Sequence, residues 1–172
     1  MTYYHICPTA FGYAAILFQK APLLVKRIFL PHARKSALKR HIQSTCPATS
    51  ASASEVVALC RDIQAYFEGS PVSPPRRFLD LSRLTPLQRS VLEAVARVPH
   101  GQVRTYSQIA DQIGRAKAFR FVGAALSLNP FPMLIPCHRI VRSDGSPGEF
   151  SGGADLKHRM LTLEGVSVSR GR

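Results

Sequence analysis

Cys137 is the residue best placed for nucleophilic chemistry, because His138 and Arg139 follow it directly. The thiolate is the reactive form of cysteine, and a neighbouring base and nearby cations raise the thiolate fraction. The apolar residues 133–135 predict a short strand, and Pro136 rigidifies the turn from which Cys137 emerges. Spacing alone leaves three interpretations open: a nucleophile, a metal ligand, or a small structural residue of the core.

The other cysteines point to no disulfide scaffold. Cys7, Cys46 and Cys60 form no CxxC pair with one another or with Cys137, which favours a reducing compartment. A zinc site in the first half would have to gather His5, Cys7, His32 and Cys46, but their spacing matches no zinc pattern. We therefore expect no metal.

The charge of the chain is strongly unbalanced. It has 23 Lys and Arg against 10 Asp and Glu, a net charge of +13. Such a surface attracts polyanions, of which nucleic acids are the commonest, although a merely solvated basic surface is the alternative.

Hydrophobic residues make up 45% of the chain, which is enough for a packed core. No run approaches the roughly 18 apolar residues of a membrane span, so we expect no membrane partner.

The first half predicts a small α/β domain over residues 1–78. Residues 15–19 and 24–30 predict paired strands, and the basic, Ser-rich and Ala-rich segment 31–54 predicts a loop. A helix is expected at about 54–68, capped by Ser54 and ended by Gly69. A linker at about 69–78 then leads to a second domain, 79–172.

The second domain predicts three helices near its start. Thr85 and Thr105 each begin a capping box, in which the fourth residue is a glutamine. The helix that starts after Thr105 closes at Gly114, and a third helix is expected from about 117 to 128. Two short helices joined by a tight turn fit a helix-turn-helix, whose second helix contacts nucleic acid.

The two faces of the third helix follow from its period of about 100° per residue. We expect one face to pack inward, and it comprises Phe119, Val122, Gly123 and Leu126. The other face combines cations, small residues and one aromatic side chain: Lys117, Arg120, Phe121, Ala124 and Ala125. Small residues allow a close approach to a groove, and cations meet phosphates or replace an extruded base. An ordinary solvated face is the alternative.

A family resemblance favours the nucleophile among the three interpretations of Cys137. The sequence PCHRIV at 136–141 resembles the signature of the O6-alkylguanine-DNA alkyltransferases, also called methylated-DNA–protein-cysteine methyltransferases. Further segments resemble the same family in order over roughly residues 80–166: GQVRTYSQIA at 101–110, RFVG at 120–123, NP at 129–130, SGG at 151–153, Lys157, and LTLEG at 161–165. The first half resembles it only loosely.

The resemblance implies a fold and an activity. The fold is α/β, with a small N-terminal domain built on a short antiparallel sheet. The C-terminal domain is mainly helical and carries a winged-helix-like helix-turn-helix. The activity is direct-reversal DNA repair, the single-turnover transfer of a methyl or other alkyl group from O6 of guanine, and also from O4 of thymine, to Cys137 after base flipping. The partner is double-stranded DNA containing O6-alkylguanine. The protein would be a monomer without a cofactor, cytoplasmic and nucleoid-associated in a prokaryote or nuclear in a eukaryote.

The resemblance also assigns catalytic residues. Cys137 accepts the alkyl group, His138 takes its proton through a water, and Glu164 orients the imidazole, which is the logic of a triad. Asn129 holds the turn that carries the cysteine. Tyr106 donates a proton or hydrogen bond toward N3 of the guanine and presses on the phosphate during flipping.

Binding residues come from the same comparison. Arg120 enters the base stack in place of the flipped base. The other DNA-contacting candidates are Tyr106, Arg115, Lys117, Phe121, Ala124 and Ser127. The backbone at Cys137 and Ile140 reads the exocyclic amine of the guanine, and the amide of Ser151 faces O6. The remaining substrate-binding candidates are Phe150, Gly152 and Lys157.

The sequence departs from the family pattern at three places. Phe121 replaces a small alanine, and we hypothesise that it acts as an apolar wedge in the minor groove. Phe150 replaces a tyrosine, and Pro147 stiffens the same loop. The rival classes are a lesion-sensing relative without transfer, a helix-turn-helix regulator, and a metal-dependent hydrolase. The first normally lacks the acceptor cysteine, the second needs no such motif, and the third lacks a ligand set.

Overall fold

The computed structural model describes residues 1–71 and 75–168, and the chain divides into two compact units, Met1–Asp80 and Leu81–Arg172. Each unit has its own core and is described by itself. The linker expected at about 69–78 falls partly on residues 72–74, which lie outside the described residues.

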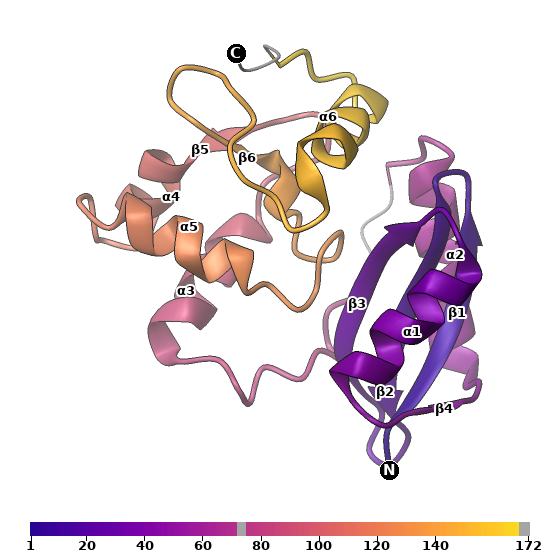
Figure 1. The fold of residues 1–172 in the computed structure, drawn as a ribbon. Coiled ribbons are helices and arrows are strands. Elements are labelled where there is room, and N and C mark those ends of the chain that lie inside the picture. The colour runs from indigo at the N-terminus through magenta and orange to yellow at the C-terminus, as the bar shows by residue number, and fades with distance from the viewer. Residues whose placement is uncertain (72–74, 169–172) are drawn as a thin grey trace. The chain divides into compact units, whose positions relative to one another are not determined.

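Unit 1 is built on a four-stranded sheet (Figure 1). Its strands are β1 (Tyr3–Thr9), β2 (Gly12–Gln19), β3 (Leu24–His32) and β4 (Thr49–Ser50), in the order β3-β2-β1-β4. The two predicted strands are confirmed as the antiparallel pair β2 and β3, and β1, which was not predicted, forms a hairpin with β2. Gly12 has a φ of +119°, and a Cβ there would come within 2.4 Å of the carbonyl oxygen of His32, so the hairpin requires glycine.

Helix α1 (Lys35–Thr45) lies on one face of this sheet, within the segment expected to be a loop. That prediction is wrong, because Leu38 and Ile42 are one turn apart and both are fully buried against Tyr4, Leu17 and Phe29 of the strands. Tertiary burial of an amphipathic face outweighs the missing cap and the basic composition.

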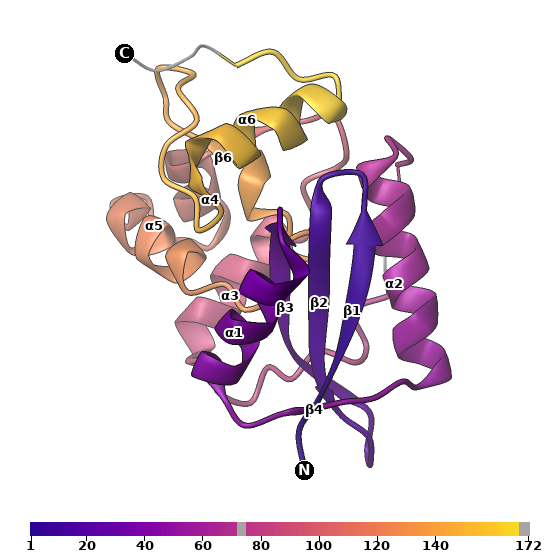
Figure 2. The same cartoon turned by 45° about the vertical axis from the view of Figure 1, so that its right-hand side comes forward.

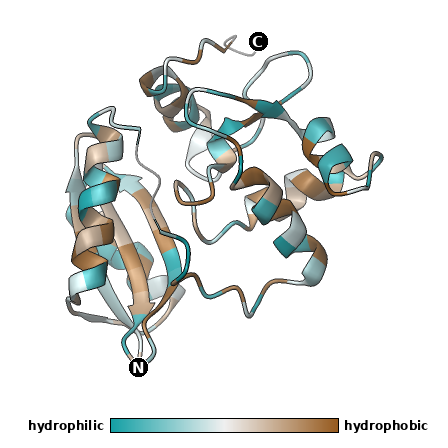
Figure 3. Cartoon of the chain, turned by 180° about the vertical axis from the view of Figure 1, so that it is seen from behind, coloured by the Kyte–Doolittle hydropathy of each residue, from teal (hydrophilic) through white to brown (hydrophobic). Residues whose placement is uncertain are grey.

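Helix α2 (Ser54–Phe67) covers the other face of the sheet (Figure 2). The spacing of its apolar residues predicted this helix. Hydrophobic and hydrophilic residues alternate along it (Figure 3), and Val56, Leu59 and Ile63 are buried. The predicted cap is wrong: Ala53 holds the N-cap position, and the hydroxyl of Ser54 donates instead to Glu55.

Unit 2 is mainly helical. Its elements are α3 (Pro86–Val95), β5 (Arg104–Thr105), α4 (Tyr106–Gln112), α5 (Phe119–Ser127), β6 (Ile140–Val141) and α6 (Gly153–Leu163). Both predicted capping boxes are confirmed, with Thr85 bonded to Gln88 and Thr105 to Gln108. Together with the sheet of unit 1, this arrangement confirms the predicted fold class. No helix among the described residues is long and apolar enough to cross a membrane.

The strand expected at residues 133–135 is instead a turn. Met133 has a φ of 74°, which a strand does not allow. A short 3-10 turn, Cys137–Arg139, follows and leads into β6. Strand β6 pairs in parallel with β5, which brings Val141 opposite Thr105 and therefore places the start of α4 beside the segment that follows Cys137.

Candidate active site

Cys137 lies at the wall of a pocket of about 870 Å³ within unit 2. The thiol-bearing residue is only 5% exposed. The rest of the lining comes from α4, α5 and the loop after β6: Tyr106, Ser107, Phe119, Arg120, Gly123, Ala124, Leu126, Ser127, Arg142, Ser143, Asp144, Glu149, Phe150 and Ser151. A pocket of this volume is large enough for a nucleobase-sized ligand.

Behind the cysteine, a buried carboxylate joins two basic side chains. Nε2 of His138 lies 2.7 Å from Oε1 of Glu164, and the guanidinium of Arg139 binds both carboxylate oxygens, at 2.9 and 3.0 Å. The backbone N–H of Gly101 also donates to Oε2, at 3.1 Å. The contacts of His138 and Arg139 thus hold Glu164, at the C-terminal end of α6, beside the turn that carries Cys137.

Burial sets the resting charges of this cluster. Burial lowers the pKa of His138, although the hydrogen bond to Glu164 opposes that shift. Burial alone would raise the pKa of Glu164, but the hydrogen bonds from His138 and Arg139 outweigh it and hold the pKa well below its usual range. The cluster at neutral pH is therefore a carboxylate, a neutral imidazole and a guanidinium.

The thiol of Cys137 is protonated at rest for the same reason. Burial raises its pKa, while the hydrogen bond with Asn129 and the positive charge of Lys157 act in the opposite direction. A neutral imidazole in the next residue can take the thiol proton, and Glu164 then stabilises the resulting imidazolium. Since Nε2 faces Glu164, the accepting atom is Nδ1.

Asn129 spans the turn before the cysteine. Its side-chain N–H donates to the carbonyl of Ile135 at 2.9 Å, and its side-chain oxygen accepts from the backbone N–H of Phe131, also at 2.9 Å. These two bonds satisfy a buried turn in which Met133 adopts a positive φ. The amide thereby fixes the backbone just before Cys137.

Lys157 is fully buried and does not line the pocket. Its ammonium donates a hydrogen bond to the carbonyl of Ile140, in the strand that follows the cysteine. Burial lowers its pKa to about 8, and the charge of Cys137 partly opposes that shift. The family resemblance places Lys157 among the substrate-binding residues, but its side chain lies outside the pocket lining and contacts the backbone of β6 instead.

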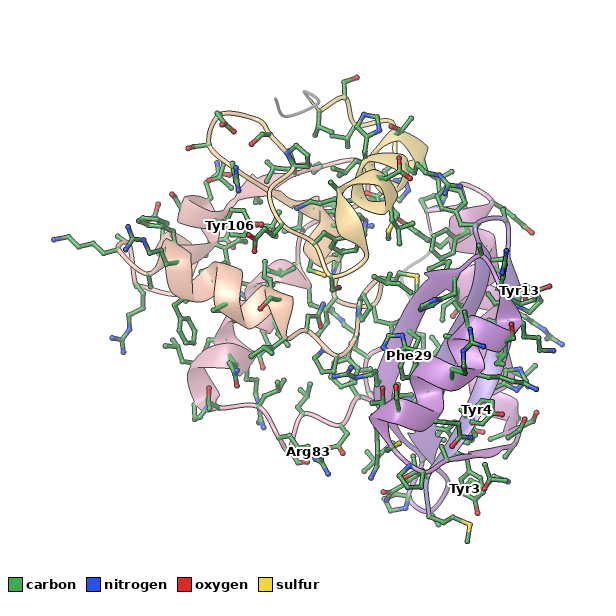
Figure 4. All side chains as sticks on the ribbon, in the orientation of Figure 1. Tyr3, Tyr4, Tyr13, Phe29, Arg83 and Tyr106 are labelled. Carbon is green, nitrogen blue, oxygen red and sulfur yellow. The ribbon has the colours of Figure 1, made fainter. Side chains whose placement is uncertain are left out.

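Tyr106 stands at the start of α4, beside the loop that follows β6 (Figure 4). Its hydroxyl lies 3.5 Å from the carbonyl oxygen of Glu149, and a Cβ at Gly148 would come within 2.9 Å of the same hydroxyl. Burial, and secondly the charge of Cys137, raise the pKa of Tyr106. The phenol therefore stays protonated and can donate toward a ligand in the pocket.

Helix α5 presents a different face from the one expected. Phe119, predicted to pack inward, is 45% exposed and lines the pocket, with the guanidinium of Arg120 over its ring at 6.0 Å. Ala125, predicted to face outward, is buried with Val122 and Leu126. Phe121 is half-buried and is not among the pocket-lining residues. The buried residues of α5 begin at Val122. Phe119 is the first residue of the helix and precedes them.

The other expected binding residues fall into two groups. Ala124, Ser127, Phe150 and Ser151 line the pocket with Tyr106 and Arg120. The rest lie outside the lining. Arg115 and Lys117 are exposed in the turn between α4 and α5, Gly152 is exposed at the start of α6, and Ile140 is buried in β6.

The candidate metal ligands of unit 1 are not gathered. His5 contacts Ala51 and Ser52, while Nε2 of His32 lies 3.2 Å from Nδ1 of His41. Cys7 on β1 is fully buried, and its interaction with Cys60 of α2, together with burial, raises its pKa. Among the described residues, no group of three or more His, Cys, Asp or Glu side chains could hold a metal ion.

Comparison with known proteins identifies the family. Residues 86–166 match the model of the 6-O-methylguanine DNA methyltransferase DNA-binding domain. A methylated-DNA–protein-cysteine methyltransferase of Saccharolobus islandicus is 43% identical over 106 residues, which cover 62% of this chain and 67% of that protein. This chain belongs to the methylated-DNA–protein-cysteine methyltransferase family.

Other family members show how far the similarity extends. The enzyme of that name from Methanothermobacter thermautotrophicus is 43% identical over 110 residues, and the chain spans 61% of its length. A crystal structure of the Mycobacterium tuberculosis family member in complex with DNA superimposes with a TM-score of 0.75 at 28% identity, covering 94% of this chain and 92% of that chain. The structural likeness therefore includes unit 1, where the sequence resemblance is loose.

Three features of the site in this chain were not predicted from the sequence. The sequence analysis treated Arg139 only as a cation beside the cysteine, whereas its guanidinium binds Glu164 and also donates to the carbonyl of Val98 at 2.7 Å. Arg142 lines the pocket, and Gly148 allows the close approach of Tyr106. Only the position of Arg139 within the motif signalled any of these roles.

Proposed function

We propose that this protein repairs DNA by direct reversal, moving a methyl or other alkyl group from O6 of a flipped guanine, or O4 of thymine, in double-stranded DNA to Sγ of Cys137. The observation that carries this proposal is the buried Cys137 thiol at the wall of a base-sized pocket, with the His138–Glu164–Arg139 cluster directly behind it. Family membership supports the same conclusion.

The transfer is a single displacement at carbon. His138 takes the thiol proton through a water, so that Sγ attacks the alkyl carbon as the carbon–O6 bond breaks. Tyr106, kept protonated by its raised pKa, donates a hydrogen bond toward N3 of the guanine and makes the base a better leaving group. The sulfur of Cys137 exchanges its proton for the alkyl group. The released guanine takes up one proton in place of the alkyl group, so the reaction balances.

Turnover ends at this step. The product is a thioether, and no group near Cys137 among the described residues can cleave a carbon–sulfur bond. Each molecule therefore acts once. We also propose that it acts as a monomer and needs no cofactor. The site of action is the compartment that holds the DNA, which is the nucleoid region of the cytoplasm in a prokaryote or the nucleus in a eukaryote.

Helix α5 presents the DNA-facing side chains. Arg120 takes the place of the flipped base in the stack, and the small Ala124 and Ser127 let the helix approach the groove closely. Arg115 and Lys117, in the exposed turn before α5, contact phosphates. Phe150 stacks on the extruded base, with its ring 6.5 Å from that of His138, while the backbone at Ile140, Ser151 and Gly152 recognises its edge.

Intact-protein mass spectrometry tests the proposal directly. The protein is incubated with an oligonucleotide duplex containing one O6-methylguanine, and the expected result is a mass gain of one methylene group, mapped to Cys137 by peptide analysis. Cys137→Ser is expected to show no gain. A wild-type protein that binds the duplex without gaining mass would instead be a lesion sensor, and the proposal would fail.

A further inference from the structure

The first 54 residues contain no acidic side chain. They carry seven Lys and Arg residues, and the first carboxylate of the chain is Glu55, in α2. The seven cations are Lys20, Lys26, Arg27, Arg34, Lys35, Lys39 and Arg40. This concentration of positive charge lies in unit 1, which supplies no residue to the proposed chemistry.

Helix α1 gathers the densest part of this charge on the surface. Arg34 at its N-cap position and Lys35, Lys39 and Arg40 along it are all exposed, while Leu38 and Ile42 turn toward the sheet. The helix lies on the face of the sheet opposite α2 (Figure 2). Its outer surface is otherwise polar, with serine, glutamine and histidine side chains and no exposed large apolar residue.

The composition of α1 opposes its own stability. Cations at a helix N-terminus interact unfavourably with the helix dipole, and the first turn contains no acidic residue. Arg34 provides no side-chain cap, and Lys35 and Lys39 form a like-charge pair four residues apart. A segment that breaks several local rules together is a candidate for function.

Among residues 1–71 and 75–168, no carboxylate forms an ion pair with these cations. The ion pairs recorded in the described part of the chain all involve Glu164 of unit 2, so none reaches α1. On the α2 side of unit 1 a carboxylate is present, since the charge of Arg77 acts on Glu55. Four of the seven cations in the acid-free segment 1–54 therefore lie on α1 or directly before it.

We infer that α1, with Arg34 before it, is a second contact surface for the phosphate backbone of double-stranded DNA. This inference rests on the proposed function for its choice of polyanion, because DNA is the polyanion on which that function operates. The exposed side chains of α1 are flexible cations and small polar groups, which suit phosphates and carry no apolar anchor for a membrane. The contact is independent of base sequence and of the lesion.

The salt dependence of binding to an undamaged duplex tests this inference. Each phosphate contact contributes about 0.9 to the slope of log affinity against log salt concentration. The double variant Lys39→Gln/Arg40→Gln of the full chain is expected to reduce the slope by about 1 to 2, measured by fluorescence anisotropy with a labelled duplex. The matched control, Arg61→Gln/Arg77→Gln, removes the same charge from the α2 side and is expected to leave the slope unchanged.

Reaction with a free O6-benzylguanine base provides the second measurement. This substrate has no phosphate, so both double variants are expected to alkylate Cys137 at the wild-type rate, which shows an intact fold and an intact site. Equal slopes for the α1 variant and wild type would overturn the inference, as would equal losses in both variants. Failure of the proposed function has a different result: the wild-type protein itself gains no mass from the duplex that contains O6-methylguanine.

Discussion

At the scale of single residues, Glu164 connects the proposed alkyl transfer with stability, because one buried carboxylate binds both His138 and Arg139. In Glu164→Gln the neutral amide no longer stabilises the imidazolium, and the buried guanidinium loses its counter-charge. We expect alkyl transfer to slow by at least about 100-fold and the free energy of unfolding to fall by about 3 kcal/mol. Single-turnover kinetics and chemical denaturation measure the two effects.

The matched control for this substitution is Glu93→Gln, which removes an exposed carboxylate from α3. It should change the free energy of unfolding by no more than about 0.5 kcal/mol. A Glu164→Gln protein that remains folded and transfers the alkyl group at the wild-type rate would remove Glu164 from the mechanism.

Lys157 offers a prediction with a defined pH dependence. Burial lowers its pKa from an ordinary value of 10.5 to about 8, so between these two pH values the unfolded chain holds more protons than the folded protein. Stability from this group therefore rises with pH. Between pH 7 and 9 the wild type should gain about 1 kcal/mol over Lys157→Met, as measured by denaturation at each pH. The exposed Lys117→Met should show no such trend.

At the scale of elements, the two phenylalanines of α5 differ in exposure from what their spacing predicted. Phe119 is exposed at the pocket beside Arg120, whereas Phe121 is half-buried. We expect Phe119→Ala to weaken binding to a lesion-containing duplex about tenfold, because an aromatic–base contact is lost. Phe121→Ala should leave binding within about twofold and instead lower the free energy of unfolding by about 1 kcal/mol. Weaker binding by Phe121→Ala and unchanged binding by Phe119→Ala would instead support Phe121 as the apolar wedge in the minor groove.

The elements that the sequence predicted well are those whose local signals agree with their packing. The capping boxes at Thr85 and Thr105 and the spacing of α2 need no information from elsewhere in the chain. Helix α1 was missed because its start has no cap and its stability comes from Leu38 and Ile42 on the sheet. The turn at residues 133–135 was mistaken for a strand because an apolar run does not reveal the side-chain bonds of Asn129.

The same distinction applies to the active site. Cys137 and His138 are adjacent in sequence, and the motif around them was enough to select them. Glu164 was chosen only through the family resemblance, because its contact with His138 depends on how α6 meets the turn after Pro136. The close approach of Gly148 to Tyr106 joins a loop to the start of α4, 42 positions earlier, and nothing in the sequence marks it.

At the scale of the whole molecule, both units are basic. Residues 1–80 carry ten Lys and Arg against four Asp and Glu, and residues 81–172 carry 13 against six. The charge is therefore not confined to the unit that contains Cys137. For the proposed function, positive charge spread over both units is expected to speed the encounter with DNA and to hold the protein there without base recognition.

This distribution predicts a difference between two substrates of the same cysteine. Between 50 and 200 mM salt, the second-order rate constant for a lesion in duplex DNA should fall about tenfold or more, because counterions compete with lysine and arginine for phosphate. The rate constant for free O6-benzylguanine should change by less than about twofold, since a neutral base has no long-range attraction to screen. Both rates can be followed by the mass of the alkylated protein. Equal salt sensitivity would mean that salt acts on the buried Glu164 cluster or on Cys137 itself, and the net charge of +13 would then have no part in capturing DNA.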